Sequence, residues 1–520
     1  MITSCLSKLI LIPLSIVISA CSTLSGSSVL AGSPTSPEKN VQDYFTATPS
    51  LPKIRPSATT AIEPTPTIAS LSTEGPWLVF TTNGALWATD GKVAREFYRP
   101  PKYYPLSELP MVPSFAAAPN GARLAFSAPS LESSLYPPQQ SLFLVQFPAA
   151  TPTKIADLIS LEEIQKLPTQ FPGDPLEPRS DPWYQGEQIR AAVSRKKSIA
   201  WSPDGKLLAV VAARDAPNTD LYTYDLLTGK MTRLTSGPYQ TADLSWSPNG
   251  RSIVHSAISD INIGRSGTDN VEGVWAANPY SNDVVRLGSG QDYFIEWIDN
   301  QTALLYTWLV PCSSYNLISV DTGTGESKSL WAAAFNEAAV DPETGTILVG
   351  VSFYDPDSTF TDVCHIPLQP NGLYIIKPGQ EPIKIAEYNE GYWPSIIWSA
   401  DAQTFFVNTP AGVIQVTSSG QISPTKPHVS EIPIPSPNGE YWAVIDDQNG
   451  LSITSPNSPT KINVSSEACQ AIWKPDAKAI YFTDYTGLYV AEAPAFKPQT
   501  IFHYSDSAEL CWANWAWVTR

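Results

Sequence analysis

Charged residues, histidine and methionine are scarce in this chain of 520 residues. Asp, Glu, Lys and Arg make up 16% of it, well below the roughly 25% of ordinary soluble proteins. The 49 prolines argue against long helices, because proline removes a backbone donor and clashes with the preceding turn. Acidic residues exceed basic ones, and the formal net charge is −17. A general nucleic-acid-binding protein needs a basic surface, so that class is excluded.

Motifs of common catalytic and nucleotide-binding sites are also missing. The sequence contains no Gly-x-Ser-x-Gly, no His-Glu-x-x-His and no phosphate-binding glycine loop ahead of a helix. Its 4 histidines have no metal-ligand spacing. We therefore assign no catalytic residue and no metal site, and we expect no cofactor. The polar loop at 259–270 offers oxygens of the kind that calcium binds, but a solvated turn explains it better.

The N-terminus has the pattern of an export signal. A single lysine precedes the apolar stretch 9–18, which is too short to span a bilayer. Ile-Ser-Ala at 18–20 then precedes Cys21, which resembles the lipobox of bacterial lipoproteins. The resemblance implies that residues 1–20 are removed and that lipid on Cys21 anchors the chain to a membrane of the bacterial cell envelope. The serine after Cys21 implies the outer membrane in a cell that has two; an ordinary signal peptide is the alternative.

Residues 21–75 are rich in Ser, Thr and Pro and lack apolar periodicity. Such a composition predicts a disordered or polyproline-like linker. We therefore expect a tether that holds the remaining segment, 76–520, away from the membrane on its extracytoplasmic side.

A five-residue pattern recurs through that segment. Trp-Ser-Pro-Asp-Gly at 201–205 and Trp-Ser-Pro-Asn-Gly at 246–250 are its closest copies, and runs of β-formers such as 207–212 follow them. Proline fixes φ while Asn or Gly tolerates a positive φ, so each copy predicts a tight turn between two strands. Two further strand-like runs follow most copies. Weaker copies stand at 117–121, 398–402, 435–439 and 473–477.

Four strands in a repeat of about 40–45 residues are typical of a β-propeller blade. The repeats resemble the WD40-like Trp-Ser-Pro-Asp-Gly blades of TolB-type propellers over roughly 76–520, which implies an all-β propeller and protein–protein contacts in the envelope. Three strand-like runs in 77–98 lack a first strand, and 511–518 supplies one, so the last strand should complete the first blade. Eight or nine blades are expected, with a pair of smaller propellers as the alternative. The tryptophan position of the repeat falls at 117, 201, 246, 297, 340, 398, 435, 473 and 515.

The two faces of such a ring differ in loop length. One, the turn face, carries the Pro-Asp-Gly turns and the short turns between third and fourth strands. The other, the looped face, carries the loops between second and third strands and the links between blades. Its insertions, 99–113, 128–141, 157–197, 258–271 and 352–371, favour a binding face, although neutral decoration is the alternative. Within 157–197, a capping box at 160–163 and a proline at 168 predict a short helix.

Aromatic residues gather in the links of the looped face. Each combines a ring that stacks with a polar tip, as binding surfaces favour. Several would serve equally as packing between blades. The candidates for the binding face are Tyr103, Tyr104, Trp183, Tyr184, Tyr239, Tyr293, Tyr388, Tyr392 and Trp393.

Four cysteines remain after Cys5 and Cys21 are set aside, and all four are placed on the looped face. Cys312 and Cys364 fall in loops of neighbouring blades, and Cys469 and Cys511 precede two neighbouring first strands. An even number in an exported chain predicts disulfides. Adjacency favours Cys312–Cys364 and Cys469–Cys511 among the three possible pairings. A zinc site would need the close paired spacing that is absent from this sequence.

Two functions follow from these features. The first is a surface-tethered binding or scaffold module whose partner is an envelope protein or polysaccharide. The alternative is a carbohydrate-active enzyme, a lyase or hydrolase, on the same face or in the channel. Its first candidates are Asp243, Glu296 and His365. Because no catalytic motif occurs, the sequence favours binding over catalysis.

Overall fold

The computed structural model describes part of the chain in detail. The chain divides into two units, Met1–Ile68 and Ala69–Arg520, and the described residues belong to the second. The signal segment, Cys21 and most of the linker lie outside them. The described residues are 70–82, 84–100, 114–129, 139–160, 162, 182–215, 217–262, 268–309, 314–352, 369–388, 394–409, 411–425, 429, 431–446, 450–456, 458–503, 511 and 513–520.

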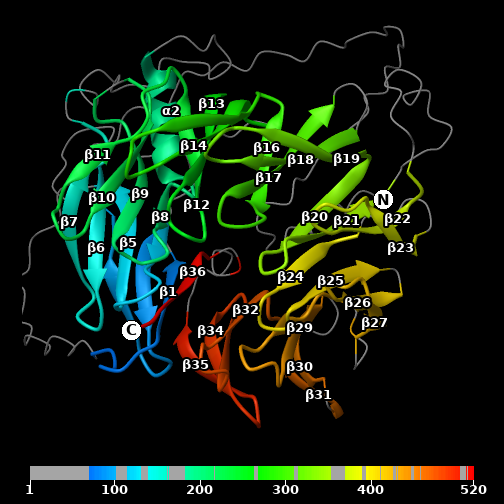
Figure 1. The fold of residues 1–520 in the computed structure, drawn as a ribbon. Helices are drawn as coiled ribbons and strands as arrows, with labels where there is room; N and C mark the ends of the chain where they lie inside the picture. The colour runs from blue at the N-terminus through cyan, green and yellow to red at the C-terminus, as the bar shows by residue number, and fades with distance from the viewer. Residues whose placement is uncertain are drawn as a thin grey trace, which may run out of the picture. The chain divides into compact units, whose positions relative to one another are not determined.

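The described residues form nine four-stranded antiparallel sheets arranged in a ring (Figure 1). This confirms the all-β propeller and fixes the number of blades at nine. In each sheet, neighbours in space are neighbours in sequence, apart from the sheet that joins the two ends of the chain. The first strand of a blade, such as β32 or β36, lies toward the centre of the ring (Figure 1). The fourth strand, such as β31 or β35, lies at the edge of the ring.

The blades are numbered along the chain, and within each blade the strands follow from the first to the fourth. Blade 1 consists of β36 (Trp515–Val518), β1 (Trp77–Thr82), β2 (Ala85–Thr89) and β3 (Ala94–Tyr98). Blade 2 consists of β4 (Ser114–Ala117), β5 (Arg123–Pro129), β6 (Gln140–Gln146) and β7 (Thr151–Asp157). Blade 3 consists of β8 (Ile199–Trp201), β9 (Leu207–Ala212), β10 (Asp220–Asp225) and β11 (Met231–Arg233). Blade 4 consists of β12 (Gln240–Trp246), β13 (Ile253–Asp260), β14 (Asn270–Ala277) and β15 (Val284–Gly288). Blade 5 consists of β16 (Asp292–Trp297), β17 (Thr302–Leu309), β18 (Ser314–Asp321) and β19 (Ser327–Ala333). Blade 6 consists of β20 (Phe335–Asp341), β21 (Thr346–Val351), β22 (Gly372–Ile376) and β23 (Ile383–Glu387). Blade 7 consists of β24 (Ile396–Ser399), β25 (Thr404–Thr409), β26 (Gly412–Val416) and β27 (Ile422–Pro424). Blade 8 consists of β28 (Ile434–Pro435), β29 (Trp442–Asp446), β30 (Gly450–Ser455) and β31 (Ser458–Ser465). Blade 9 consists of β32 (Gln470–Trp473), β33 (Ala479–Thr483), β34 (Gly487–Glu492) and β35 (Lys497–His503).

The repeated turn owes its shape to side-chain hydrogen bonds. In blade 3, the hydroxyl of Ser202 donates to Asp204 Oδ1 at 2.7 Å and accepts the backbone N–H of Leu207 at 2.9 Å. Gly205 has a φ of 69°, which a residue with a Cβ rarely adopts. The Ser-Pro-Asp-Gly sequence therefore specifies the turn locally, before any contact with another blade.

The repeated tryptophan joins one blade to the one before it. The indole N–H of Trp201 donates to Ala116 O at 2.9 Å, and that of Trp246 donates to Ala200 O at 3.0 Å. In both pairs the acceptor belongs to the first strand of the preceding blade. This hydrogen bond explains why tryptophan recurs at the end of the first strand.

The last strand closes the ring as expected, but the tryptophan position of the repeat falls at residue 517, two residues after the predicted position 515. β36 pairs with β1 and completes blade 1. In blade 3, Trp201 pairs with Leu208, the second residue of its second strand. The equivalent pair in blade 1 is Trp517 with Leu78. The prediction of position 515 for the ninth tryptophan was therefore wrong, because 511–518 holds three tryptophans and only pairing with β1 sets the register.

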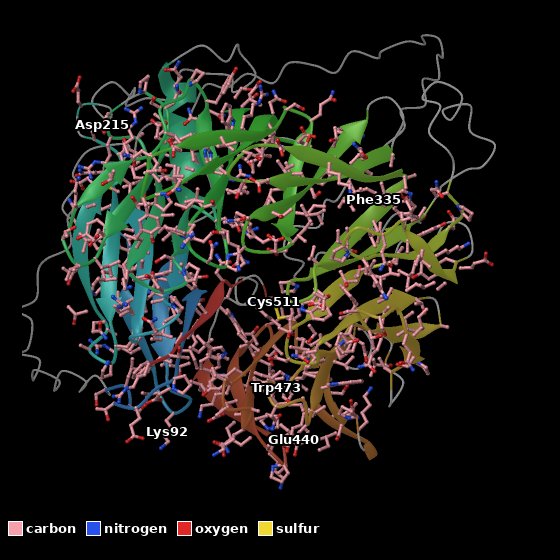
Figure 2. All side chains as sticks on the ribbon, viewed as in Figure 1. Lys92, Asp215, Phe335, Glu440, Trp473 and Cys511 are labelled. Carbon is pink, nitrogen blue, oxygen red and sulfur yellow. A yellow bond between two sulfur atoms is a disulfide. The ribbon has the colours of Figure 1, made fainter. Side chains whose placement is uncertain are left out.

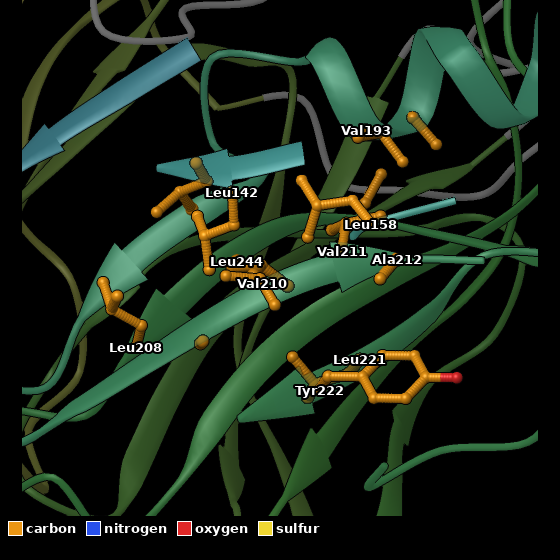
Figure 3. Close-up of a cluster of buried hydrophobic side chains, with 14 of the residues drawn as sticks. Leu142, Leu158, Val193, Leu208, Val210, Val211, Ala212, Leu221, Tyr222 and Leu244 are labelled. Carbon is orange, nitrogen blue, oxygen red and sulfur yellow. The ribbon is translucent and has the colours of Figure 1, made fainter. Parts of the chain in front are cut away.

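Apolar clusters fill the spaces between successive blades. Figure 3 shows the cluster between blades 2, 3 and 4, where Leu142, Val210 and Leu244 meet with almost no exposed surface. Similar clusters join the remaining neighbours, including blades 9 and 1 through Tyr481 and Leu78. Because every blade buries both of its sheet faces, the ring is one continuous core rather than two smaller propellers.

The insertion between blades 2 and 3 contributes a helix to this core. α2 (Pro182–Ser194) has 13 residues and begins with proline, whose missing N–H is tolerated at a first helical position. The helix expected at 160–168 lies almost wholly outside the described residues. Among the residues that are described, no helix has the length and apolar character needed to cross a bilayer.

Candidate functional site

The candidate site lies where the strands of blades 3 to 5 meet the looped face. Most residues of the long insertions on this face, such as 163–181 and 353–368, lie outside the described residues. The site is therefore built from α2, the strand ends of this face and the described parts of the loops beside them.

α2 is fixed to blade 4 by a pair of hydrogen bonds. Gln188, which is 4% exposed, accepts the N–H of Ile261 at 2.6 Å and donates to its carbonyl at 2.9 Å. Ile189, Ala192 and Val193 of the same helix are buried in the cluster between blades 2, 3 and 4. This part of the insertion is therefore integral to the core and not a neutral decoration.

Arg195, one residue beyond α2, bonds two carboxylates. Its Nη2 lies 2.7 Å from Oδ2 of Asp269 and 3.3 Å from Oδ2 of Asp243. Burial acts to lower the pKa of Arg195, but the charge of Asp243 and the hydrogen bond to Asp269 outweigh it and raise the pKa. Between 21% and 24% of each side chain stays exposed. The three groups thus join the insertion to the first strand of blade 4 and to the loop before β14.

Asp243 occupies a β-bulge in the middle of β12. The pairing with β13 shifts between Ala242 and Ser245, and Asp243 has a φ of 56°. Aspartate tolerates this left-handed conformation better than most residues, and such bulges redirect a side chain at functional sites. The bulged residue carries the carboxylate that Arg195 binds.

Three tyrosines extend the site across blade 5. Tyr293 stacks on Tyr306 with ring centroids 5.0 Å apart, and the edge of Tyr315 meets Tyr306 at 5.4 Å. Burial raises the pKa of Tyr293, and the charge of Asp269 raises it further. Burial also raises the pKa values of Tyr306 and Tyr315, which interact with Tyr293. The phenols therefore remain protonated near neutral pH and act as hydrogen-bond donors rather than as bases.

We call Arg195, Asp243, Asp269, Tyr293, Tyr306 and Tyr315 the Arg195 cluster. It combines aromatic faces, neutral hydroxyl donors and a paired cation in a half-buried position. Such a set binds polar or aromatic groups by stacking and hydrogen bonding. It offers no unpaired carboxylate placed for acid–base chemistry.

Two of the three residues proposed for an enzyme, Asp243 and Glu296, are described by the structure. Asp243 is paired with Arg195, and Glu296 is exposed, with its Oε1 accepting the backbone N–H of Trp297 at 3.0 Å. His365 lies outside the described residues. Asp243 and Glu296 lie on the first strands of neighbouring blades.

The polar loop considered for calcium makes contacts with protein groups. Asp260 accepts a hydrogen bond from Gln188 at 3.3 Å, and Asp269 accepts one from the backbone of Asn262 at 2.8 Å besides its bond to Arg195. In the part of the chain that is described, no three His, Cys, Asp or Glu side chains gather as metal ligands do. Calcium binding by this loop remains an untested prediction.

The predicted aromatic candidates occupy different surroundings. Tyr239 is 39% exposed in the link between blades 3 and 4, whereas Tyr388 packs against the cluster between blades 6 and 7. Tyr293 belongs to the Arg195 cluster. Trp183 and Tyr184 are on α2, but their side chains are outside the described part of the structure. Tyr103, Tyr104, Tyr392 and Trp393 lie outside the described residues.

One of the two predicted disulfides is present. Cys469 and Cys511 are bonded, with Cα atoms 5.4 Å apart. Cys511 lies beside β36, where the ring closes (Figure 2). Cys312 and Cys364 lie outside the described residues, so their pairing remains a prediction.

Sequence reasoning missed Arg195, Tyr306 and Tyr315. Arg195 belongs to Arg-Lys-Lys at 195–197, where nothing local distinguishes one cation from the next. Tyr306 and Tyr315 lie within predicted strands, so only their place at the looped-face ends of β17 and β18 could have indicated them.

Comparisons with known proteins show no family for this chain. No family model matches the chain. The uncharacterised peptidase YuxL of Bacillus subtilis (strain 168) is 36% identical over 75 residues, 14% of this chain, so the chain spans about a tenth of that curated relative (10%). Among solved structures, a eukaryotic initiation factor matches at 12% identity and a TM-score of 0.49, over 85% of this chain and 98% of its own. A putative TolB from Agrobacterium tumefaciens matches at 16% identity and a TM-score of 0.27, over 51% and 79%. By its own sheet topology, the chain is a nine-bladed β-propeller, and its structural neighbours include TolB.

Proposed function

We propose that this chain is a lipid-tethered propeller of the bacterial cell envelope that binds an envelope protein or polysaccharide through its looped face. The observation that carries the proposal is the Arg195 cluster, which places stacked tyrosines and hydrogen-bond donors at that face. Binding surfaces are enriched in tyrosine and arginine for this reason. The lipid on Cys21 and the linker 21–75 would keep the ring near the membrane while leaving this face free.

Two further exposed tyrosines lie outside the Arg195 cluster. Tyr239 lies in the link before β12, and Tyr485, which is 54% exposed, lies between β33 and β34. Both positions belong to the looped face. On the turn face, Tyr280 is 66% exposed between β14 and β15. It therefore offers a matched control of the same residue type.

An affinity capture from envelope extract tests the proposal. The full chain, exported and oxidised, is immobilised in the presence of calcium, and bound protein and glycan are analysed by mass spectrometry. We expect one enriched component that the variant Tyr239→Ala/Tyr485→Ala loses and Tyr280→Ala retains. Equal capture by both variants would contradict a site on the looped face. A glycan that is shortened during incubation would instead support the carbohydrate-active enzyme.

A further inference from the structure

An open groove lies on the flank of the ring between blades 4 and 5. Its volume is about 460 Å³. One wall is formed by the end of β15 with Arg286, and the other by Asn316 and Ser327 of blade 5. Asp292 and Thr307 lie deeper, where β16 begins on the looped face. These residues are not members of the Arg195 cluster, so this inference goes beyond the proposed function and does not depend on it.

Arg286 is held in place without a carboxylate partner. Its Nε donates to Gly288 O at 3.0 Å, its Nη2 donates to Glu272 O at 3.2 Å, and its guanidinium lies 5.6 Å from the ring centroid of Trp275. Among the described residues, no acidic side chain forms an ion pair with it. Three of its five N–H groups therefore have no partner among the residues that the structure describes. A fixed guanidinium with free donors is ready to bind a planar anion.

The carboxylate in the groove is already satisfied by its neighbours. Asp292 is 6% exposed and accepts the N–H and the hydroxyl of Ser289, the latter at 2.9 Å, together with the hydroxyl of Thr307. These three hydrogen bonds hold the carboxylate of Asp292 in place at the base of the groove. Its remaining lone pairs are suited to accept a hydroxyl.

The opposite wall offers neutral polar groups. Asn316 Oδ1 accepts the hydroxyl of Ser329 at 2.8 Å, which orients the amide and leaves its NH₂ group as a donor. Ser327 is exposed and adds a hydroxyl. The groove thus presents one cationic fork and several groups that bind hydroxyls.

We propose that this groove binds a sugar acid, with the carboxylate of the ligand on Arg286 and its hydroxyls on Asn316, Ser327 and Asp292. The parallel N–H groups of a guanidinium bind a planar carboxylate through two hydrogen bonds. A single negative charge also suits a chain whose net charge is −17, because a doubly charged anion is repelled more strongly.

Titration of the full chain with sodium D-glucuronate tests this site by calorimetry, with D-glucose and sodium sulfate as comparison ligands. We expect saturable binding of glucuronate and none of glucose or sulfate under the same conditions. Arg286→Gln should weaken it by roughly tenfold or more, since charge-assisted hydrogen bonds are lost. Arg286→Lys should be intermediate, because it keeps the charge and loses the fork. Arg251→Gln, at an exposed arginine of the turn face, is the control and should bind as the unchanged chain does.

Other outcomes overturn the assignment. Glucuronate binding no stronger than that of glucose contradicts a carboxylate site, and sulfate binding as strong as that of glucuronate contradicts its selectivity. If Arg286→Gln lowers the melting temperature, Asn316→Ala decides, because its amide bonds only one exposed side chain. Undiminished glucuronate binding by Asn316→Ala would then place the ligand elsewhere.

Discussion

Cys469 and Cys511 join the two blades between which the ring closes, with their Cα atoms 5.4 Å apart. Cys469 precedes β32 of blade 9, and Cys511 precedes β36, the strand that completes blade 1. Next to the disulfide, Gln470 Nε2 donates to Ala513 O at 3.1 Å. The last strand is therefore held by a covalent bond as well as by its pairing with β1.

The disulfide should contribute measurably to stability. It encloses a segment with a sequence separation of 42, for which loop-closure entropy corresponds to about 4 kcal/mol. We predict that Cys469→Ala/Cys511→Ala lowers the free energy of unfolding in urea by up to this amount. Adding a thiol reductant should destabilise the unchanged chain more than it destabilises the variant. Equal stability of the two oxidised chains would contradict a role for the bond in closure.

His255 should make the fold sensitive to acid. Its side chain is 4% exposed in β13, and neither ring nitrogen has a hydrogen-bond partner among the described residues. Burial lowers the pKa of His255 from 6.5 to about 4, while the backbone of Ser256 offsets part of the shift. The unfolded chain therefore binds a proton at a higher pH than the folded chain does. The stabilisation that depends on neutral His255 is fully present above pH 6.5. It is lost as pH decreases toward 4, which lowers the free energy of unfolding by on the order of 3 kcal/mol.

Urea unfolding between pH 7 and pH 4 measures this effect. The variant His255→Phe should lose the part of the pH dependence that this histidine causes, because phenylalanine does not titrate. His503→Phe, at an exposed histidine of β35, is the control and should retain it. A pH profile of His255→Phe identical to that of the unchanged chain would show that the buried imidazole is not responsible.

Arg195 should stabilise α2 and the loop before β14. Arg195→Met leaves Asp243 and Asp269 without their shared cation. Breaking a fully buried ion pair costs about 3–5 kcal/mol of stability. Because these side chains are 21–24% exposed, we expect the free energy of unfolding to fall by a smaller amount, about 1–2 kcal/mol. Hydrogen exchange should quicken in α2. Lys206→Met is the control, because Lys206 pairs with Asp204 on the surface with 80% of its side chain exposed. Unchanged hydrogen exchange in α2 of the Arg195→Met variant would contradict the role of the cluster.

Strand positions were predictable where local sequence decides them. The run 207–212 was expected as a strand and is β9 with those bounds. It follows a turn whose hydrogen bonds are made by its own residues, as Ser202 and Asp204 show. The same repeated turn led to the expectation of eight or nine blades, and the described residues form nine.

Features that depend on contacts between distant segments were not predictable. The register of the last strand depends on β1, more than 430 residues earlier (518 against 77), and three tryptophans in 511–518 made the choice ambiguous. The Arg195 cluster joins positions 195, 243 and 269, which come together only after blades 3 and 4 pack. Sequence periodicity carries no information about such pairs.

Site-specific photo-crosslinking in the cell tests the binding role of the looped face most directly. A photoreactive phenylalanine replaces Tyr239, Tyr485 or Tyr280 in the full chain, expressed from Met1, and the adducts are identified by mass spectrometry. The account predicts adducts to the same envelope component from positions 239 and 485, and none from position 280. Adducts from position 280 alone would place the partner on the turn face and contradict the account.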